Sequence, residues 1–439
     1  MSVANSFRVI GGNTMSGDIY PQGAKNEALQ VISAVMLTDQ KVTLTNVPDI
    51  LDVRRLIELL KGLGVNINRL NANDYEFQAA DIDLNYLASE EYQKTAKRIR
   101  GSVMLMGPMI ARYGKAYMPK PGGDKIGRRR LDTHINGFNK LGATFQFDKE
   151  RDSYYIGGEN LKGTYILMEE ISVTGTANIL MAASLTPGET TIYNAACEPY
   201  LQQLCKMLTG MGAKIAGVGS NKLIVTGVDR LEGTSLEVMP DFIEIGSFIG
   251  LAAMTQSAIS IKGAGKADLG IIPNVFRSLG VELEWRGEDL FVPAQEIYEV
   301  QPFIDGSILT IYDSPWPGFT PDLISIILVM ATQAKGSVLI HQKMFESRLF
   351  FVDKLIDMGA QIILCDPHRA TVIGLARQHK LRAIEMTSPD IRAGVSLLIA
   401  ALSAEGTSII HNIQQIDRGY QHIDTRLNAI GAQIERVHI

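Results

Sequence analysis

The sequence predicts an α/β protein of two similar domains, each built from three repeated units of helices and strands. Three observations support this prediction: the chain is 439 residues long, a helix-to-strand motif recurs along it, and several helical segments are apolar on nearly all sides. At roughly 100 to 200 residues per domain, the length alone requires more than one hydrophobic core.

A short motif, in which an apolar residue and a glycine precede a segment of alternating apolar residues, occurs six times. Its glycines follow one another at intervals of 68 to 79 residues, at Gly64, Gly142, Gly212, Gly280, Gly359 and Gly431. Each glycine follows an amphipathic helical pattern, and glycine is the favoured residue just past the last turn of a helix. Regular recurrence at this interval predicts one supersecondary unit per repeat.

Each repeat also contains a helical segment that is apolar almost all round. These segments are expected to begin near Lys25, Arg100, Gly175, Ile245, Asp322 and Arg392. A helix without a polar face has to be enclosed by other structure. Each repeat is therefore predicted to supply one buried helix, one outer helix and about four strands.

The last repeat lacks a closing strand, and the beginning of the chain supplies one. Residues 7–12 followed by 16–20 resemble residues 154–158 followed by 161–166, and residues 223–227 followed by 231–238. We therefore expect residues 23–236 to form one domain and residues 1–22 with 237–439 to form the other, with crossings near Gln22 and Met239. Two domains joined by two crossings can close on a ligand.

Composition restricts the classes of function. The chain is 46% hydrophobic and carries a formal net charge of −5, which argues against a general nucleic-acid binder. Its apolar runs fall short of the roughly 20 residues that a bilayer requires, and its start does not resemble a signal peptide, so no membrane partner and a cytoplasmic location are expected. Three cysteines and seven histidines show no metal-ligand spacing, so neither a metal nor a cofactor is expected. We expect a monomer or a weak homo-oligomer.

Charged residues stand where the enclosed helices begin. Lys25 opens the first of them, and Arg100, Asp322 and Arg392 hold the same place in later repeats. A helix N-terminus attracts anions, and the ends of enclosed helices have to face polar groups. Arginines also stand in charged clusters at Arg348 and Arg418, which suits a substrate bearing carboxylate and phosphate groups.

In one repeat, the short connection between strand and helix is replaced by a glycine-rich basic loop at residues 121–134. A solvated charge run or a nucleic-acid patch would also explain its composition, but aromatic residues are not interleaved with its basic ones. We interpret the loop as a mobile lid that binds an anion.

These residues resemble the enolpyruvyl transferase family, and within it the UDP-N-acetylglucosamine 1-carboxyvinyltransferases of peptidoglycan precursor synthesis. The resemblance runs end to end and includes Gly23-Ala-Lys-Asn26, Pro121-Gly-Gly123, Asp132 with His134, Pro321-Asp322, Asp390 with Arg392, and Ile416-Asp-Arg-Gly-Tyr420. It implies two domains of three βαβαββ units whose buried helices are wrapped by sheets, an inside-out α/β barrel.

The resemblance implies a reaction without metal or cofactor. The 3-hydroxyl of UDP-N-acetylglucosamine adds to C2 of phosphoenolpyruvate while C3 is protonated, and the adduct then loses phosphate together with a proton from C3, which restores the double bond. The implied ligands of phosphoenolpyruvate are Lys25, Arg129 and Arg418 for its phosphate, Arg348 and Arg392 for its carboxylate, and Arg100 as a supporting charge.

Further roles follow from the same resemblance. Asp322 is similar to the residue that accepts the proton of the sugar hydroxyl, Asn26 is similar to a sugar contact, and Asp390 is expected to assist proton movement or to orient the arginines. The stretches that match the uridine and diphosphate site contain Leu131, Asp132, Ser172, Val173 and Thr174.

The chain departs from the family pattern at Asp124, where the lid usually has cysteine. We predict that Asp124 is the general acid, because burial beside an anionic substrate raises the pKa of a carboxyl group above its reference value of about 3.9. Fosfomycin, which alkylates the family cysteine, is expected to fail against this protein. Other departures are Glu170 for a basic residue, Thr174 for glycine, Arg130 for proline and Ser347 for asparagine.

Two alternatives stay open at this point. The sister enzyme transfers the same group to shikimate 3-phosphate, and a catalytically inactive relative would only bind UDP-N-acetylglucosamine. Turnover with each acceptor distinguishes them.

Overall fold

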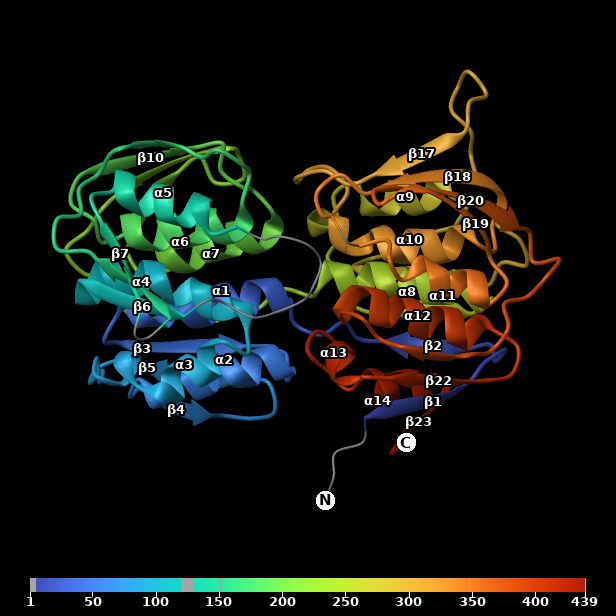
Figure 1. Ribbon diagram of the computed structural model, residues 1–439, viewed down its shortest axis with the longest axis horizontal. Helices are drawn as coiled ribbons and strands as arrows, with labels where there is room; N and C mark the ends of the chain where they lie inside the picture. The colour runs from blue at the N-terminus through green and yellow to red at the C-terminus, as the bar shows by residue number, and fades with distance from the viewer. Residues whose placement is uncertain (1–4, 120–129, 150–151, 347, 439) are drawn as a thin grey trace. The chain divides into compact units, whose positions relative to one another are not determined.

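The computed structural model describes residues 5–119, 130–149, 152–346 and 348–438. These residues divide into two units (Figure 1). The first unit contains residues 23–119, 130–149 and 152–239, and the second contains residues 5–22, 240–346 and 348–438. Each unit is a mixed α/β assembly, as the sequence predicts.

In the described part of the first unit, three sheets have the strand orders β13-β3-β5-β4, β6-β8-β7 and β11-β12-β10-β9. Their strands are β3 (Lys41–Thr45), β4 (Asn66–Arg69), β5 (Tyr75–Gln78), β6 (Lys115–Pro119), β7 (Thr144–Asp148), β8 (Ser153–Gly157), β9 (Tyr165–Leu167), β10 (Glu189–Tyr193), β11 (Lys214–Ala216), β12 (Lys222–Thr226) and β13 (Thr234–Glu237). The α-helices are α1 (Lys25–Ala34), α2 (Leu51–Gly62), α3 (Glu90–Ala96), α4 (Met106–Tyr113), α5 (Asp132–Lys140), α6 (Val173–Ala183) and α7 (Pro199–Gly210).

Over its described residues, the second unit has sheets of order β21-β22-β1-β23, β15-β16-β14-β2 and β17-β18-β20-β19. Their strands are β1 (Ser6–Ile10), β2 (Ser16–Ile19), β14 (Ala258–Ile261), β15 (Glu284–Arg286), β16 (Asp289–Val292), β17 (Leu309–Tyr312), β18 (Lys335–His341), β19 (Gln361–Asp366), β20 (Arg369–Leu375), β21 (Glu385–Thr387), β22 (Thr407–His411) and β23 (Gln433–Val437). The α-helices are α8 (Phe242–Met254), α9 (Ile272–Ser278), α10 (Ile324–Ala331), α11 (Val352–Asp357), α12 (Ile391–Ser403), α13 (Gln414–Asp417) and α14 (Ile423–Asn428).

The apolar helices lie inside the sheets, as their sequences predict. In the second unit α8, α10 and α12 contact one another, and each also contacts strands of a different sheet (Figure 1). Every residue of α8 and α10 is buried. In the first unit α6 contacts both α1 and α4. The helices therefore form the centre of each core, with the sheets around them.

The six repeat glycines all adopt the left-handed backbone that a helix C-terminus requires. Their φ angles lie between 89° and 113°. Such angles are strained for residues that carry a Cβ atom. At Gly280 a Cβ atom would also lie 2.4 Å from the backbone nitrogen and oxygen of Glu299. The repeat motif therefore marks a real backbone requirement.

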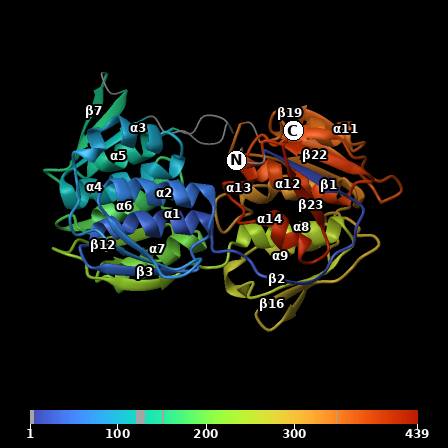
Figure 2. The same cartoon turned by 90° about the horizontal axis from the view of Figure 1, so that it is seen from below.

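The first strands of the chain complete sheets of the second unit. β1 lies between β22 and β23 (Figure 2) and pairs antiparallel with both. β2 pairs parallel with β14. Phe7 and Val9 of β1 are fully buried. The beginning of the chain therefore supplies a strand to the sheet that contains β22 and β23, the last two strands of the sequence.

Two buried helices begin differently from the prediction. The segment near Arg100 starts as a 3₁₀ helix, η3 (Arg100–Leu105), and continues as α4. Pro108 explains this break, because proline has no N–H and its ring clashes with the preceding turn of an α-helix. Asp322 likewise lies in a 3₁₀ turn, η5 (Pro321–Leu323), ahead of α10.

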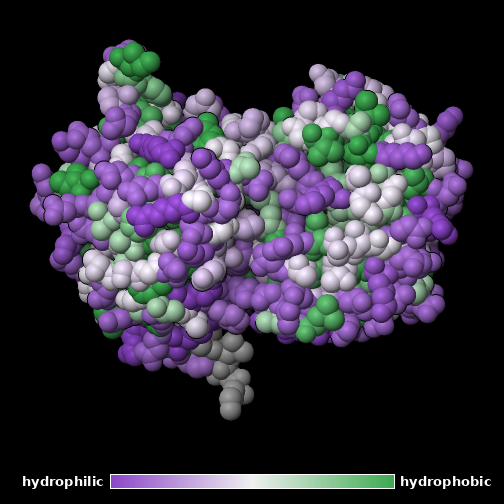
Figure 3. All heavy atoms as spheres, turned by 180° about the vertical axis from the view of Figure 1, so that it is seen from behind, coloured by the Kyte–Doolittle hydropathy of each residue, from purple (hydrophilic) through white to green (hydrophobic). Residues whose placement is uncertain are grey.

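The connection between β16 and β17 projects from the second unit and ends in apolar side chains (Figure 3). Phe303 and Ile304 are exposed at its tip. Asp305 Oδ1 accepts hydrogen bonds from Ser307 N at 3.0 Å and from Ser307 Oγ at 2.6 Å, which closes the turn. Phe303 and Ile304 therefore present apolar surface outside the core.

Candidate functional site

In the second unit, one carboxylate lies against two arginines. Asp322 Oδ1 accepts a hydrogen bond from Arg348 Nη2 at 2.6 Å, and Asp322 Oδ2 lies 3.2 Å from Arg392 Nη2. The three side chains are 18%, 10% and 7% exposed, respectively. Two guanidinium groups around one carboxylate leave a net positive charge that suits a further anion. The structure thus brings together three of the residues that the sequence singled out.

A chain of hydroxyl groups supports Arg392 from its other side. Arg392 Nη1 donates to Tyr420 Oη at 3.1 Å, and Tyr420 Oη lies 2.9 Å from Ser247 Oγ. Ser247 Oγ in turn donates to the carbonyl of Ile243. Because Arg392 can only donate, Tyr420 donates its own proton to Ser247. The guanidinium is therefore oriented by three successive hydrogen bonds.

The electrostatic environment keeps this pair in fixed protonation states. Burial raises the pKa of Tyr420 to about 12 despite the opposing effect of Arg392, so the phenol stays neutral. Burial lowers the pKa of Arg392, but attraction to Tyr420, Asp322 and Asp241 outweighs it and raises the pKa overall. Arg392 is therefore a permanent cation.

Asp390 caps the helix that bears Arg392. Its Oδ1 atom accepts hydrogen bonds from the backbone N–H groups of Arg392 at 2.8 Å and Ala393 at 3.0 Å. Such a cap satisfies backbone donors that the first turn leaves without partners. The structure thus places Asp390 where it fixes the backbone of α12 at its start.

Arg418 lies at the end of α13, where α13 contacts α12. Its Nη1 atom donates to Gln415 Oε1 at 2.8 Å, and the residue is buried. The following Gly419 is needed for close packing, because a Cβ atom there would lie 2.4 Å from the Ile391 side chain. Arg418 is therefore held close to the start of α12.

A chain crossing is fastened to the same region. Gln22 Nε2 donates to the carbonyl of Gly419 at 2.8 Å, and Gln22 Oε1 accepts from Gln421 N at 2.6 Å. The backbone N–H of Gln22 donates to Glu244 Oε2 at 2.7 Å, and Glu244 also pairs with Arg426 at 2.6 Å. The segment that follows Arg418 is therefore tied directly to the crossing. Sequence reasoning did not identify Gln22, Glu244 or Arg426 as part of the site.

Asp313 holds the turn that leads to Arg348. This fully buried carboxylate accepts hydrogen bonds from Gln342 Nε2 and Lys343 N, and from Met344 N at 3.1 Å. Burial raises its pKa, although the hydrogen bonds from the turn act in the opposite direction. Asp313 also begins the segment that ends at Asp322. One buried side chain therefore connects the two segments that carry Asp322 and Arg348.

In the first unit, Lys25 is the first residue of α1 and pairs with Asp52 of α2. The Lys25 Nζ and Asp52 Oδ2 atoms are 2.8 Å apart, and both side chains are less than 10% exposed. A buried pair of this kind fixes the position of the ammonium group, because separating the charges would leave one of them without compensation. Asn26 follows on α1 and is half-buried. Sequence reasoning missed Asp52.

The residues that match a nucleotide site lie at two neighbouring helix starts. Leu131 and Asp132 lie at the start of α5, and Ser172 caps α6 through a hydrogen bond from Gly175 N to its Oγ atom at 3.1 Å. Val173 and Thr174 are the first two residues of α6, and α5 contacts α6. Arg100 opens η3, which contacts α6 as well. The structure thus brings these stretches together within one unit.

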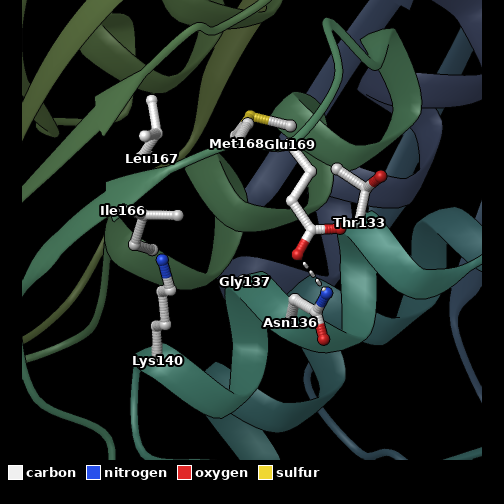
Figure 4. A pocket seen from close by; sticks show the side chains of 8 residues that line it. All are labelled: Thr133, Asn136, Gly137, Lys140, Ile166, Leu167, Met168 and Glu169. Carbon is white, nitrogen blue, oxygen red and sulfur yellow. Dashed lines mark hydrogen bonds between the residues drawn. The ribbon is translucent and has the colours of Figure 1, made fainter.

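Polar side chains tie α5 to the segment before α6. Thr133 Oγ1 donates to Glu170 Oε1 at 3.0 Å. Asn136 Nδ2 donates to Glu169 Oε1 at 2.9 Å, as Figure 4 shows. A hollow lined by Thr133, Asn136, Gly137, Lys140 and residues 166–169 lies beside these bonds. Glu170, which departs from the family pattern, is therefore engaged by its neighbour on α5.

A buried histidine adds a third connection. His134 Nε2 lies 3.1 Å from Thr174 Oγ1, and His134 Nδ1 lies 2.9 Å from Asn178 Nδ2. Burial, and to a smaller extent the charge of Arg100, lowers the pKa of His134 to about 3. The imidazole is therefore neutral at physiological pH. The sequence placed His134 in a motif but indicated no role for it beyond structure.

Asp124 and Arg129 of the predicted lid lie outside the residues that the structure describes, and so does Ser347. Within the described ranges, no three His, Cys, Asp or Glu side chains are grouped so as to hold a metal ion. None of the helices in those ranges is long and apolar enough to span a bilayer.

Comparison with known proteins places these features in a family. A family model described as EPSP synthase (3-phosphoshikimate 1-carboxyvinyltransferase) matches residues 9–427. A UDP-N-acetylglucosamine 1-carboxyvinyltransferase of Bacteroides fragilis is 64% identical over 98% of this chain and 100% of its own length. The protein of that name from Porphyromonas gingivalis is 63% identical over the same shares of each chain.

Solved structures share the fold at low sequence identity. The enolpyruvyl transferase NikO from Streptomyces tendae superposes with a TM-score of 0.85 at 20% identity, over 99% of each chain. An EPSP synthase from Acinetobacter baumannii gives a TM-score of 0.72 at 18% identity, over 98% of this chain and 99% of that one.

Proposed function

The chain belongs to the EPSP synthase (3-phosphoshikimate 1-carboxyvinyltransferase) family, and we propose that it transfers the enolpyruvyl group of phosphoenolpyruvate to the 3-hydroxyl of UDP-N-acetylglucosamine. The observation that carries this proposal is the carboxylate of Asp322 held between Arg348 and Arg392. That arrangement joins a proton acceptor to two binding groups for a carboxylate. The relatives at 64% and 63% identity favour UDP-N-acetylglucosamine over shikimate 3-phosphate as the acceptor.

Substrate binding activates Asp322 in this proposal. The carboxylate of phosphoenolpyruvate binds Arg348 and Arg392 and competes with Asp322 for their N–H groups. An aspartate that loses such partners is less stabilised as an anion and accepts a proton more readily. Asp322 then takes the proton of the sugar hydroxyl as its oxygen attacks C2.

Fixed cations stabilise the charge that develops on the phosphate. Lys25, Arg129 and Arg418 bind it, and Arg100 supports them. Asp52 and Gln415 support the proposal, because they hold Lys25 and Arg418 in place before the substrate arrives. Groups that need no reorganisation contribute most to lowering a barrier of this kind.

Protonation of C3 is assigned to Asp124. Asp390 acts on the arginines by fixing the first turn of α12, which bears Arg392. Asn26 contacts the sugar, and the starts of α5 and α6, with Leu131, Asp132, Ser172, Val173 and Thr174, bind the uridine and diphosphate. The product would enter peptidoglycan precursor synthesis in the cytoplasm.

The test is phosphate release from phosphoenolpyruvate by the purified protein, with UDP-N-acetylglucosamine or shikimate 3-phosphate as acceptor. Release with the UDP-sugar alone supports the proposal, and release with shikimate 3-phosphate alone replaces it with the sister activity. Binding of UDP-N-acetylglucosamine without any release would identify an inactive relative.

The variant Asp124→Ala, assayed in parallel, tests the general acid. Loss of release supports Asp124, whereas unchanged release transfers that role to another group. Lys125→Ala is the control, because it changes the same loop but keeps the carboxyl group of Asp124. We also expect the mass of the protein to be unchanged after incubation with fosfomycin. A covalent adduct on residue 124 would contradict the expected resistance.

A further inference from the structure

The hydrogen bonds around His134 determine which of its nitrogens carries the proton. Asn178 Oδ1 accepts from Gly107 N at 2.9 Å, so the amide group of Asn178 faces its donors toward Val103 O and His134 Nδ1, each at 2.9 Å. A neutral imidazole that accepts at Nδ1 has its proton on Nε2. His134 Nε2 therefore donates to Thr174 Oγ1.

This bond joins the core to the surface of the first unit. His134 is 1% exposed and Asn178 is fully buried, whereas Thr174 is exposed. Both polar atoms of the Asn178 side chain are engaged, so the imidazole has a fixed partner on its inner side. The ring cannot turn without leaving buried polar atoms unsatisfied, which is costly.

The same bond spans two helix starts. His134 lies two residues after Asp132 in the first turn of α5, and Thr174 lies two residues after the capping Ser172 of α6. In the family that the chain resembles, glycine commonly occupies the position of Thr174, and glycine has no hydroxyl to accept this bond. The link is thus a feature of this chain.

We propose that His134 is a positioning residue for the nucleotide portion of the acceptor, because its hydrogen bond to Thr174 fixes the start of α6 against the start of α5. This inference rests on the proposed function, in which these two helix starts bind the uridine and diphosphate. His134 does not touch the reacting atoms. Its effect is on the affinity for the UDP-sugar and leaves the affinity for phosphoenolpyruvate unchanged.

Thr174→Val provides the sharpest test, because valine keeps the shape of threonine and removes the acceptor oxygen. We expect KM and Kd for UDP-N-acetylglucosamine to rise about tenfold, which corresponds to the loss of one buried hydrogen bond. KM for phosphoenolpyruvate should change far less than KM for UDP-N-acetylglucosamine, because Thr174 belongs to the proposed nucleotide site. Thr174→Ser restores the hydroxyl and should recover most of the lost affinity, which a purely steric effect of position 174 would not produce.

A double-mutant cycle ties the effect to His134. His134→Leu removes the donor, and the double variant with Thr174→Val should bind no more weakly than either single variant. Additive losses in Kd, or an unchanged Kd in Thr174→Val, would overturn the inference. Since Thr174 is exposed, its variants keep the test available even where His134→Leu does not fold.

Calorimetric measurement of Kd for UDP-N-acetylglucosamine separates this inference from the proposed function. Wild-type protein that binds the UDP-sugar but releases no phosphate would refute the proposed reaction, while the order of the variant affinities still decides the role of His134. Wild-type protein that binds no UDP-sugar would overturn both.

Discussion

Acid should destabilise this protein through His134, and the size of the effect follows from its burial. The pKa of His134 falls from 6.5 to about 3 in the folded protein, because the charged form would be buried beside Arg100. In the unfolded chain the imidazole takes up a proton below pH 6.5, whereas the folded protein does not. Stability contributed by the neutral form is therefore complete above pH 6.5 and decreases as the pH falls toward 3.

The linkage relation converts these pKa values into a free energy. Between pH 7 and pH 5 this residue lowers the free energy of unfolding by about 2 kcal/mol. For a unit of this size, that loss corresponds to a decrease in melting temperature of roughly 4 to 8 °C.

Urea unfolding of the wild type and His134→Gln at pH 7 and pH 5 measures the effect. Glutamine does not titrate, so the variant should lose about 2 kcal/mol less than the wild type between the two pH values. His379→Gln changes an exposed histidine and should keep the pH dependence of the wild type. Equal losses in the wild type and His134→Gln would show that the burial argument is wrong.

Three further predictions concern single positions. Gly280→Ala should lower the free energy of unfolding by at least 2 kcal/mol, because its Cβ atom would clash with the backbone of Glu299. Gly212→Ala should lower it by only about 1 kcal/mol, because no atom lies within 4 Å of a Cβ at that repeat glycine. Equal losses in thermal melts would contradict the clash. Asp313→Asn should raise KM for phosphoenolpyruvate and cost about 2 kcal/mol, because the amide keeps only one acceptor oxygen and turns an NH2 group toward donors of the buried turn before Arg348. Steady-state kinetics and urea unfolding measure the two effects, and unchanged values would refute the prediction. Glu244→Gln should cost about 3 kcal/mol in urea unfolding, because the partly buried Arg426 loses the fully buried carboxylate that pairs with it. Glu435→Gln breaks an exposed pair and should cost under about 1 kcal/mol, and similar costs for the two variants would contradict the prediction.

The repeat pattern predicted the fold because each repeat imposes the same backbone requirement. Glycine at the six helix ends can be identified from the sequence alone, and so can an apolar run such as 323–331. The 3₁₀ start at Arg100 was not predicted, since the apolar pattern outweighed the local signal of Pro108. That proline was the available indication of a break.

The sequence predicted the charged residues of the site but not the side chains that hold them in place. Asp322, Arg348 and Arg392 were identified because charge is unusual at the start of an apolar helix or beside it. The sequence placed Tyr420 in a motif without indicating its bond to Arg392, and it did not identify Asp313, because both act through contacts between residues far apart in the chain. Asp52 left a signal in the sequence: a carboxylate among the apolar residues at the start of the pattern 51–62.

The pairing of β1 with β22 and β23 has a consequence for synthesis. A ribosome makes residues 6–19 before the strands that complete their sheets, and the last of those strands is β23 at residues 433–437. The first unit lies between them in the chain and can fold while its neighbours in sequence are still incomplete. β1 therefore remains unpaired until β22 and β23 have been synthesised, and β2 remains unpaired until β14 has been synthesised. Each strand carries one charged residue, Arg8 in β1 and Asp18 in β2, and such charges limit aggregation of an open strand edge during that interval.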